Sequence, residues 1–191
     1  MMESLLHIDT QILLFINSHF NPFLDKIMWF VSLTWPWIPL YLILIFIVVR
    51  NYTKEKWVLL LALVILIIGS DQLSSTVIKN LVCRLRPTHN PSLEGMIHIV
   101  NNYKGGFYGF VSSHASNTFA LATFTSFLFR NRIFSICAFF WASFISYSRI
   151  YLGVHFPGDV ACGALLGFVL AISIFKIVTI ILKNKQLTVN R

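Results

Sequence analysis

The chain has 191 residues, of which 57% are hydrophobic and only 12% are charged, and its mean hydropathy is +0.74. A soluble domain carries roughly a quarter charged residues, so this composition excludes an ordinary soluble globular protein and favours an integral membrane protein. The net charge of +8 would suit a nucleic-acid-binding protein, but the basic residues lie in short gaps between apolar runs, as residues that orient membrane spans do, and we expect no nucleic-acid partner.

The first predicted element, residues 1–22, is an amphipathic helix at the membrane interface. Its apolar residues recur at roughly helical spacing, and polar residues such as Asp9 and Asn17 lie between them. This pattern is typical of a helix that rests on a bilayer and does not cross it. Because no basic segment precedes the apolar residues, we do not expect a signal peptide.

Five longer apolar runs follow the interfacial helix. About 20 helical residues cross a hydrocarbon core of ~30 Å, so each run is predicted to be a transmembrane helix. The predicted spans are residues 27–49, 57–78, 112–129, 133–149 and 159–182. The sequence therefore predicts one all-α domain over residues 1–191, an integral membrane helical bundle of about five spans.

The basic residues between the spans predict the orientation of the bundle. If the spans alternate in direction, three basic groups share one face: Arg50, Lys54 and Lys56; Arg130 and Arg132; and Lys183, Lys185 and Arg191. We expect that face to be cytoplasmic. The long connection at residues 79–111 and the segment 148–159 then meet on the outer face.

Two polar motifs of the long connection carry candidate site residues. In KNLVCRLRP (79–87), Lys79 and Arg86 can bind phosphate oxygens, although contact with lipid headgroups is the alternative. In VSSHASN (111–117), Ser112 and Ser113 stand where a helix begins. They can cap that helix or help to bind an anion there, with His114 as a proton donor.

The third motif, SRIYLGVHFPGD (148–159), contains Arg149, His155 and Asp159. Asp159 lies one helical turn after His155, where a carboxylate can accept a hydrogen bond from one imidazole nitrogen and leave the other free to attack. The alternative is a salt bridge between Arg149 and Asp159 that closes the loop. Together, the three motifs supply the cations, the nucleophile and the acid that phosphoryl transfer needs.

In their order and spacing, these motifs resemble the three-part signature of the type 2 phosphatidic acid phosphatase superfamily. The resemblance implies a membrane lipid phosphatase that needs no metal and no cofactor. It implies that His155 forms a phosphohistidine, that Asp159 orients it, and that His114 protonates the departing alkoxide. The implied phosphate-binding residues are Lys79, Arg86, Arg149, Ser112 and Ser113.

One position departs from the family pattern, because the middle motif usually reads Pro-Ser-Gly-His and Ser113 replaces the glycine here. The resemblance implies action at the outer face of a bacterial inner membrane on a lipid A phosphate or undecaprenyl diphosphate. Phosphatidylglycerophosphate, phosphatidic acid and phosphoryl transfer to another lipid are alternatives. A transporter or channel with a basic vestibule is the non-enzymatic alternative. No obligate protein partner is indicated.

Other polar residues have structural interpretations. Asp71 lies inside the second predicted span, eight residues before Lys79, and we interpret it as a partner of a catalytic cation. His89, Glu94 and His98 are irregularly spaced in the long connection, which is more typical of solvated loop residues than of a metal site.

Overall fold

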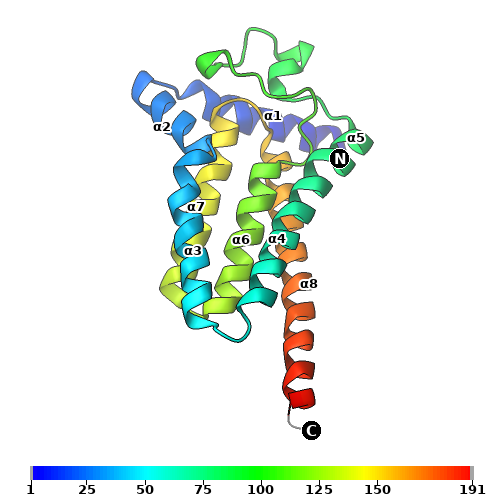
Figure 1. Ribbon diagram of the computed structural model, residues 1–191. Coiled ribbons are helices and arrows are strands. Elements are labelled where there is room, and N and C mark those ends of the chain that lie inside the picture. Colours follow the sequence, from blue (N-terminus) through cyan, green and yellow to red (C-terminus); the bar gives the residue numbers. More distant parts are fainter. Residues whose placement is uncertain (1, 190–191) are drawn as a thin grey trace.

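The structure is a computed structural model that describes residues 2–189, with side chains for residues 3–183. Within these residues the chain forms helices and no strands, so the predicted all-α membrane fold is confirmed. Figure 1 shows a bundle of upright helices with a long loop at one end, which we call the loop end, and α8 projecting beyond the other end.

Helix α1 (Met2–Ser18) lies across the loop end of the bundle (Figure 1). One of its faces exposes large apolar side chains, among them Leu5, Ile8 and Phe15, whereas Leu13 and Asn17 are fully buried. Asn17 Nδ2 donates hydrogen bonds to the carbonyls of Tyr151, at 2.7 Å, and His98, at 3.0 Å. The amphipathic helix is therefore fastened to the bundle by a buried amide.

Helices α2 (Pro22–Ser32) and α3 (Ile38–Asn51) are joined through the short 3₁₀ turn η1 (Trp35–Trp37). The two parts are bent by 67°, so the predicted span 27–49 is not one straight helix. Pro36 and Pro39 lack the N–H that a continuing helix needs, which explains why the break lies here. Asn21 caps α2 by accepting hydrogen bonds from the amides of Phe23 and Leu24.

Helix α4 (Lys56–Gln72) continues through the π-helical turn η2 (Leu73–Ile78) into α5 (Lys79–Val82). π-Turns widen a helix locally and are frequent at functional sites. Here the turn immediately precedes Lys79. The chain then leaves the helix at Cys83, and the long loop carries the 3₁₀ turns η3 (Pro87–His89), η4 (Pro91–Leu93) and η5 (Val100–Asn102).

Helix α6 (Ser113–Phe129) occupies the middle of the bundle and packs against α4, α7 (Arg132–Tyr151) and α8 (Pro157–Val189). Its closest neighbour is α8, where Gly163 and Gly167 are spaced like a small-residue packing motif. A Cβ at Gly163 would lie 2.5 Å from the carbonyl oxygen of Ser112, and one at Gly167 would overlap that of Ser116. These glycines let the start of α6 lie directly beside the start of α8.

Among the residues that the structure describes, three helical segments could cross a membrane by length and composition: Lys56–Val82, Arg132–Tyr151 and Pro157–Lys183. The bent pair of α2 and α3 could form a fourth. The sequence also predicts a span at α6, which has 17 residues and is rich in buried alanine, serine and threonine. These small side chains suit a helix enclosed by other helices in a membrane protein.

Candidate active site

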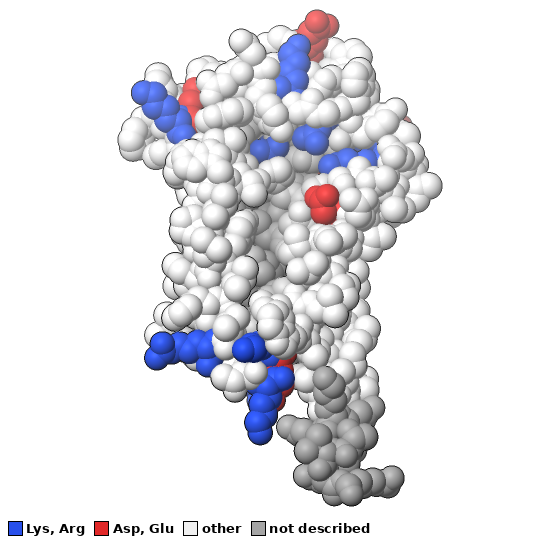
Figure 2. Space-filling view, in the orientation of Figure 1, with Lys and Arg blue, Asp and Glu red and all other residues white. Residues whose placement is uncertain are grey.

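All eight predicted site residues lie at the loop end of the bundle. Lys79 comes from the start of α5, and Arg86 from the loop. Ser112, Ser113 and His114 lie at the start of α6, Arg149 near the end of α7, and His155 and Asp159 at the α7–α8 connection. Figure 2 shows Lys and Arg side chains gathered in a hollow below the loop, apart from a second basic group at the opposite end. Segments far apart in the sequence thus form one basic site.

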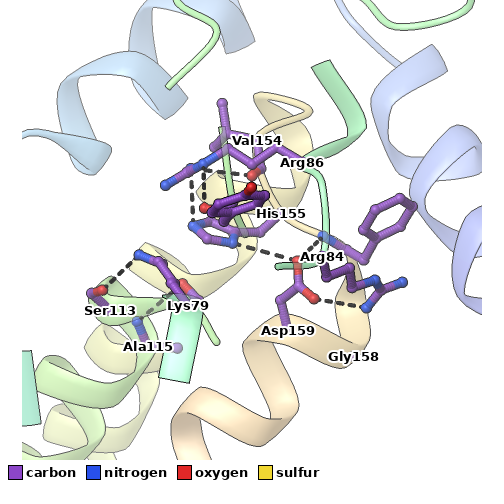
Figure 3. Close-up of polar contacts among 12 residues, drawn as sticks. Lys79, Arg84, Arg86, Ser113, Ala115, Val154, His155, Gly158 and Asp159 are labelled. Atoms are coloured by element: carbon purple, nitrogen blue, oxygen red, sulfur yellow. Dashed lines mark hydrogen bonds and ion pairs between the residues drawn. The ribbon is translucent and has the colours of Figure 1, made fainter. Parts of the chain in front are cut away.

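His155 lies at the centre of the site, with only 1% of its surface exposed. Arg86 Nη1 lies 3.2 Å from His155 Nε2 and donates a second hydrogen bond of 3.2 Å to the carbonyl of Val154 (Figure 3). Because a guanidinium can only donate hydrogen bonds, Nε2 must be the accepting nitrogen. The proton of the neutral imidazole is therefore on Nδ1.

The Nδ1 of His155 faces Asp159, whose side chain is fully buried. Asp159 Oδ2 lies 3.5 Å from Nδ1 and accepts a hydrogen bond of 3.0 Å from the amide of Phe156. The distance to Nδ1 exceeds a good hydrogen bond, but catalytic hydrogen bonds are often long until substrate is bound. The carboxylate is therefore placed to orient the imidazole.

Asp159 forms an ion pair with Arg84, whose Nη1 lies 2.7 Å from Asp159 Oδ1. The alternative salt bridge from Arg149 to Asp159 is thus wrong, because Arg149 instead donates to the hydroxyl of Tyr103 at 3.4 Å. The sequence did not single out Arg84. Its only signal is its position two residues before Arg86, since alternate residues of an extended segment point the same way.

Lys79 and the start of α6 form the other half of the site. Lys79 Nζ donates a 2.9 Å hydrogen bond to Ser113 Oγ (Figure 3). Ser112 is fully buried, its hydroxyl caps α6 by accepting from the amide of Ala115 at 3.4 Å, and its own amide donates to the carbonyl of Asp159 at 2.9 Å. Ser112 therefore joins the start of α6 to the start of α8.

His114 and Arg149 line a cavity of about 180 Å³ on the side of the site that faces α2. The other lining residues are Trp29, Ser32, Leu33, Thr34 and Tyr103. The wall thus includes the break between α2 and η1, which sequence analysis did not connect with the site. The cavity leaves room beside His114 for part of a substrate.

Burial and charge together set the protonation of the central residues. The pKa of His155 is lowered well below its usual value of 6.5, first by burial and then by Arg86, Arg149 and Lys79. Burial, followed by the nearby Arg149, also lowers the pKa of Arg86, although a guanidinium remains protonated in proteins. At neutral pH the site therefore presents a neutral imidazole among cations.

The remaining polar residues have partners of other kinds. Asp71 accepts a 3.2 Å hydrogen bond from Asn117 Nδ2, and no ion pair with a site cation is found for it within the described side chains. His98 Nε2 lies 3.0 Å from Asp25 Oδ2, whereas His89 contacts the hydroxyl of Thr88. In the described part of the chain, no three His, Cys, Asp or Glu side chains lie close enough to hold a metal ion.

Comparison with known proteins gives the family. The PAP2 superfamily profile matches residues 56–182. The chain is 41% identical over 170 residues to a lipid A 4'-phosphatase of Bacteroides thetaiotaomicron, covering 87% of this chain and 75% of the relative. It is 33% identical over 177 residues to a lipid A 4'-phosphatase of Porphyromonas gingivalis, covering 92% and 75%.

Two solved structures share the fold. The crystal structure of Aquifex aeolicus LpxE superposes with a TM-score of 0.68 at 26% identity, covering 87% of this chain and 94% of that one. A transmembrane PAP2-type phosphatidylglycerolphosphate phosphatase from Bacillus subtilis superposes with a TM-score of 0.65 at 23% identity, covering 90% and 84%.

The helical bundle and its relatives define a membrane-embedded phosphoric ester hydrolase that acts on lipids. The chain belongs to the PAP2 superfamily. The resemblance of the three sequence motifs is thereby confirmed.

Proposed function

We propose that this protein removes a phosphate group from a lipid A-type glycolipid by way of a phosphohistidine on His155. The observation that supports the proposed substrate is the 41% identity, over 87% of the chain, to a lipid A 4'-phosphatase. The observation that supports the mechanism is the geometry of His155, whose Nε2 carries the lone pair and lies among cations.

In the first step, the lone pair of His155 Nε2 attacks phosphorus, and an N–P bond forms as the ester P–O bond breaks. The electron pair of that bond goes to the lipid oxygen, which takes a proton from His114. Arg86 exchanges its hydrogen bond to Nε2 for a phosphoryl oxygen. The Nδ1 proton remains between His155 and Asp159, whose negative charge stabilises the positive ring.

In the second step, His114 accepts a proton from a water molecule that attacks phosphorus. The N–P bond breaks, its electron pair returns to Nε2, and inorganic phosphate leaves. Lys79, Arg86 and Arg149 neutralise the phosphoryl oxygens in both steps, which is where most of the rate enhancement of phosphoryl transfer arises.

We also propose that the site faces the periplasm or the cell exterior and that the protein is a multi-pass protein of a bacterial inner membrane. The positions of Arg50, Lys54, Lys56, Arg130 and Arg132 support this orientation, because all lie at or between the adjoining ends of α3 and α4 or of α6 and α7. In Figure 1 these ends lie opposite the loop end, and Figure 2 shows basic side chains gathered there. Basic residues in short loops favour the cytoplasmic side. The only partners that this proposal requires are the bilayer and a lipid phosphate substrate.

The test is phosphate release by the purified protein from a panel of lipids: bisphosphorylated lipid A, undecaprenyl diphosphate, phosphatidylglycerophosphate and phosphatidic acid. We expect lipid A to be the best substrate, with mass spectrometry showing which phosphate is lost. A phosphorylated lipid product in place of free phosphate would overturn hydrolysis, and preference for another lipid would overturn the substrate.

The mechanism has its own test. We expect His155→Ala to abolish turnover, and rapid acid-free quenching with ³²P-labelled substrate to trap label on the wild-type protein as an acid-labile phosphoramidate. His114→Ala should accumulate that label from a substrate with a good leaving group, because the second step then lacks its base. Full activity of His155→Ala would overturn the mechanism.

A further inference from the structure

Helix α1 reaches the site through Asp9, which lies outside the residues matched by the PAP2 superfamily profile, 56–182. Asp9 Oδ2 forms a 2.7 Å ion pair with Arg84 Nη2, and Arg84 Nη1 forms the 2.7 Å ion pair with Asp159 Oδ1. Arg84 thus bridges two carboxylates, one on the interfacial helix and one beside His155.

Asp9 also contacts the helix that carries Asp159. Its Oδ1 accepts a 2.7 Å hydrogen bond from the amide of Gly158, in the first turn of α8. A Cβ at Gly158 would lie 3.0 Å from Asp9 Oδ2, and a Cβ at Gly109 would lie 2.9 Å from Asp159 Oδ2. Both carboxylates therefore pack closely against the backbone of a glycine.

The charges explain why two carboxylates are present. A buried Asp159 needs a counterion, because burying a lone carboxylate is costly. If Arg84 bound Asp159 alone, the pair would be neutral and would give His155 little electrostatic support. With Asp9 as a second partner, the cluster of Asp9, Arg84 and Asp159 carries one net negative charge. That charge can support the positive ring that forms when Nε2 bonds to phosphorus.

The stacking of Arg84 strengthens this arrangement. Its guanidinium carbon lies 4.0 Å from the ring centroid of Phe156, the residue between His155 and Pro157. A planar guanidinium that is stacked and bound at both ends has little freedom to rotate. Arg84 thus holds Asp159 Oδ1 while Oδ2 faces the imidazole, as seen in Figure 3.

We propose that Asp9 and Arg84 are positioning residues for the His155–Asp159 pair, so that helix α1 is part of the catalytic apparatus. The proposal rests on the proposed role of His155 as nucleophile. Asp9 and Arg84 act through Asp159 and do not touch the substrate. Through the ion pair of Asp9 with Arg84, helix α1 is linked to the alignment of the nucleophile.

The main test compares Asp9→Asn with Glu3→Gln, which removes an equal charge from an exposed position of the same helix. For Asp9→Asn we expect kcat to fall about 10-fold, because losing this carboxylate should destabilise the positive His155 ring by as much as a pKa shift of one unit. We expect the KM of this variant to change less than about 2-fold. The acid limb of its pH–rate profile should move to lower pH, because His155 then faces Arg86, Arg149 and Lys79 with less opposing negative charge. Glu3→Gln should match the wild type.

Two further variants separate positioning from helix docking. Arg84→Lys keeps a cation but cannot bridge two carboxylates with a planar fork, so we expect it to be more active than Arg84→Gln and less active than the wild type. Asn17→Ala removes the hydrogen bonds from Asn17 to the carbonyls of Tyr151 and His98. It therefore loosens the docking of α1 without removing a charge. We expect it to lower the melting temperature without moving the acid limb.

The proposal would be overturned if Asp9→Asn left both kcat and the acid limb unchanged. It would also be overturned if Asp9→Asn and Asn17→Ala lost kcat equally and the acid limb moved in neither variant. If Asp9→Asn does not purify as a folded protein, Arg84→Lys decides, since it leaves the bond from Gly158 to Asp9 in place. Failure of the proposed mechanism is seen separately, because His155→Ala would then remain active whatever the Asp9 variant does.

Discussion

Arg86 donates through Nη1 to Nε2 of His155 over 3.2 Å, and the same guanidinium donates through Nε to the carbonyl of Tyr108 over 3.1 Å. One side chain thus contacts both the proposed nucleophilic nitrogen and the loop backbone at Tyr108. A Cβ at Gly105 would lie 2.9 Å from Arg86 Nη1, so the loop backbone lies directly on the guanidinium.

Replacing Arg86 should reduce both catalysis and order in the loop. We expect Arg86→Gln to lower kcat/KM about 100-fold or more, since it removes a charged donor to the developing phosphoryl charge. Arg86→Lys should recover part of this loss. Steady-state kinetics in detergent measures the effect, and Lys104→Gln, at an exposed loop cation, is the control that should change kcat/KM less than about 2-fold.

The pH dependence should reflect a histidine that is neutral in mildly acidic solution. Protonated imidazole has no lone pair, so activity is lost as the pH falls through the pKa of His155, which burial and three cations hold below 6.5. The acid limb of kcat/KM should therefore lie below pH 6.5. Substrates whose phosphate groups have different pKa values identify the origin of the limb, because a limb due to the enzyme stays in place and one due to the substrate moves. An enzyme limb above pH 6.5 would contradict this reasoning.

Ser113 tests how much the family's usual glycine matters. Ser113→Gly removes the acceptor for Lys79 Nζ at 2.9 Å but leaves every titratable group of the site in place. We expect kcat to change less than about 10-fold, with stability reduced by at most about 1 kcal/mol by glycine in a helix. Lys79→Met should lose far more activity, because it removes a cation. Equal losses in the two variants would show that the hydroxyl itself is essential.

Chelators should leave the activity intact. The proposed steps use only protein cations and histidines, and Lys79, Arg86 and Arg149 all lie close enough to His155 to lower its pKa. Phosphate release measured with and without excess EDTA, after dialysis, checks this expectation. Activity that falls with the chelator and returns with one added divalent cation would replace the proposed scheme with a metal-assisted one.

The close contact of α6 with α8 should be sensitive to a single methyl group. A Cβ at Gly167 overlaps the backbone of Ser116, so Gly167→Ala must push the helices apart and should cost about 1–3 kcal/mol. Thermal unfolding in detergent measures the loss. Gly69→Ala is the matched control, because a Cβ there meets nothing within 4 Å and alanine favours a helix.

The sequence by itself determined the class of fold and the reaction class. Long apolar runs require a lipid environment, and their lengths indicate helices, because only helices satisfy backbone hydrogen bonds within one segment of a bilayer. The three motifs carry the residues for phosphoryl transfer at a recognisable spacing. The predicted span 27–49 contains Pro36 and Pro39, but the bend of 67° between its two parts depends on packing that no local pattern describes.

Only the tertiary structure decided how the charges pair. The sequence left open a salt bridge from Arg149 to Asp159 as an alternative, whereas the structure pairs Asp159 with Arg84. Asp9 lies 150 residues before Asp159, and nothing in the sequence pattern of its helix distinguishes it from the other polar residues there. Ion pairs form between groups that folding brings together, and neither periodicity nor spacing records which helix ends will meet.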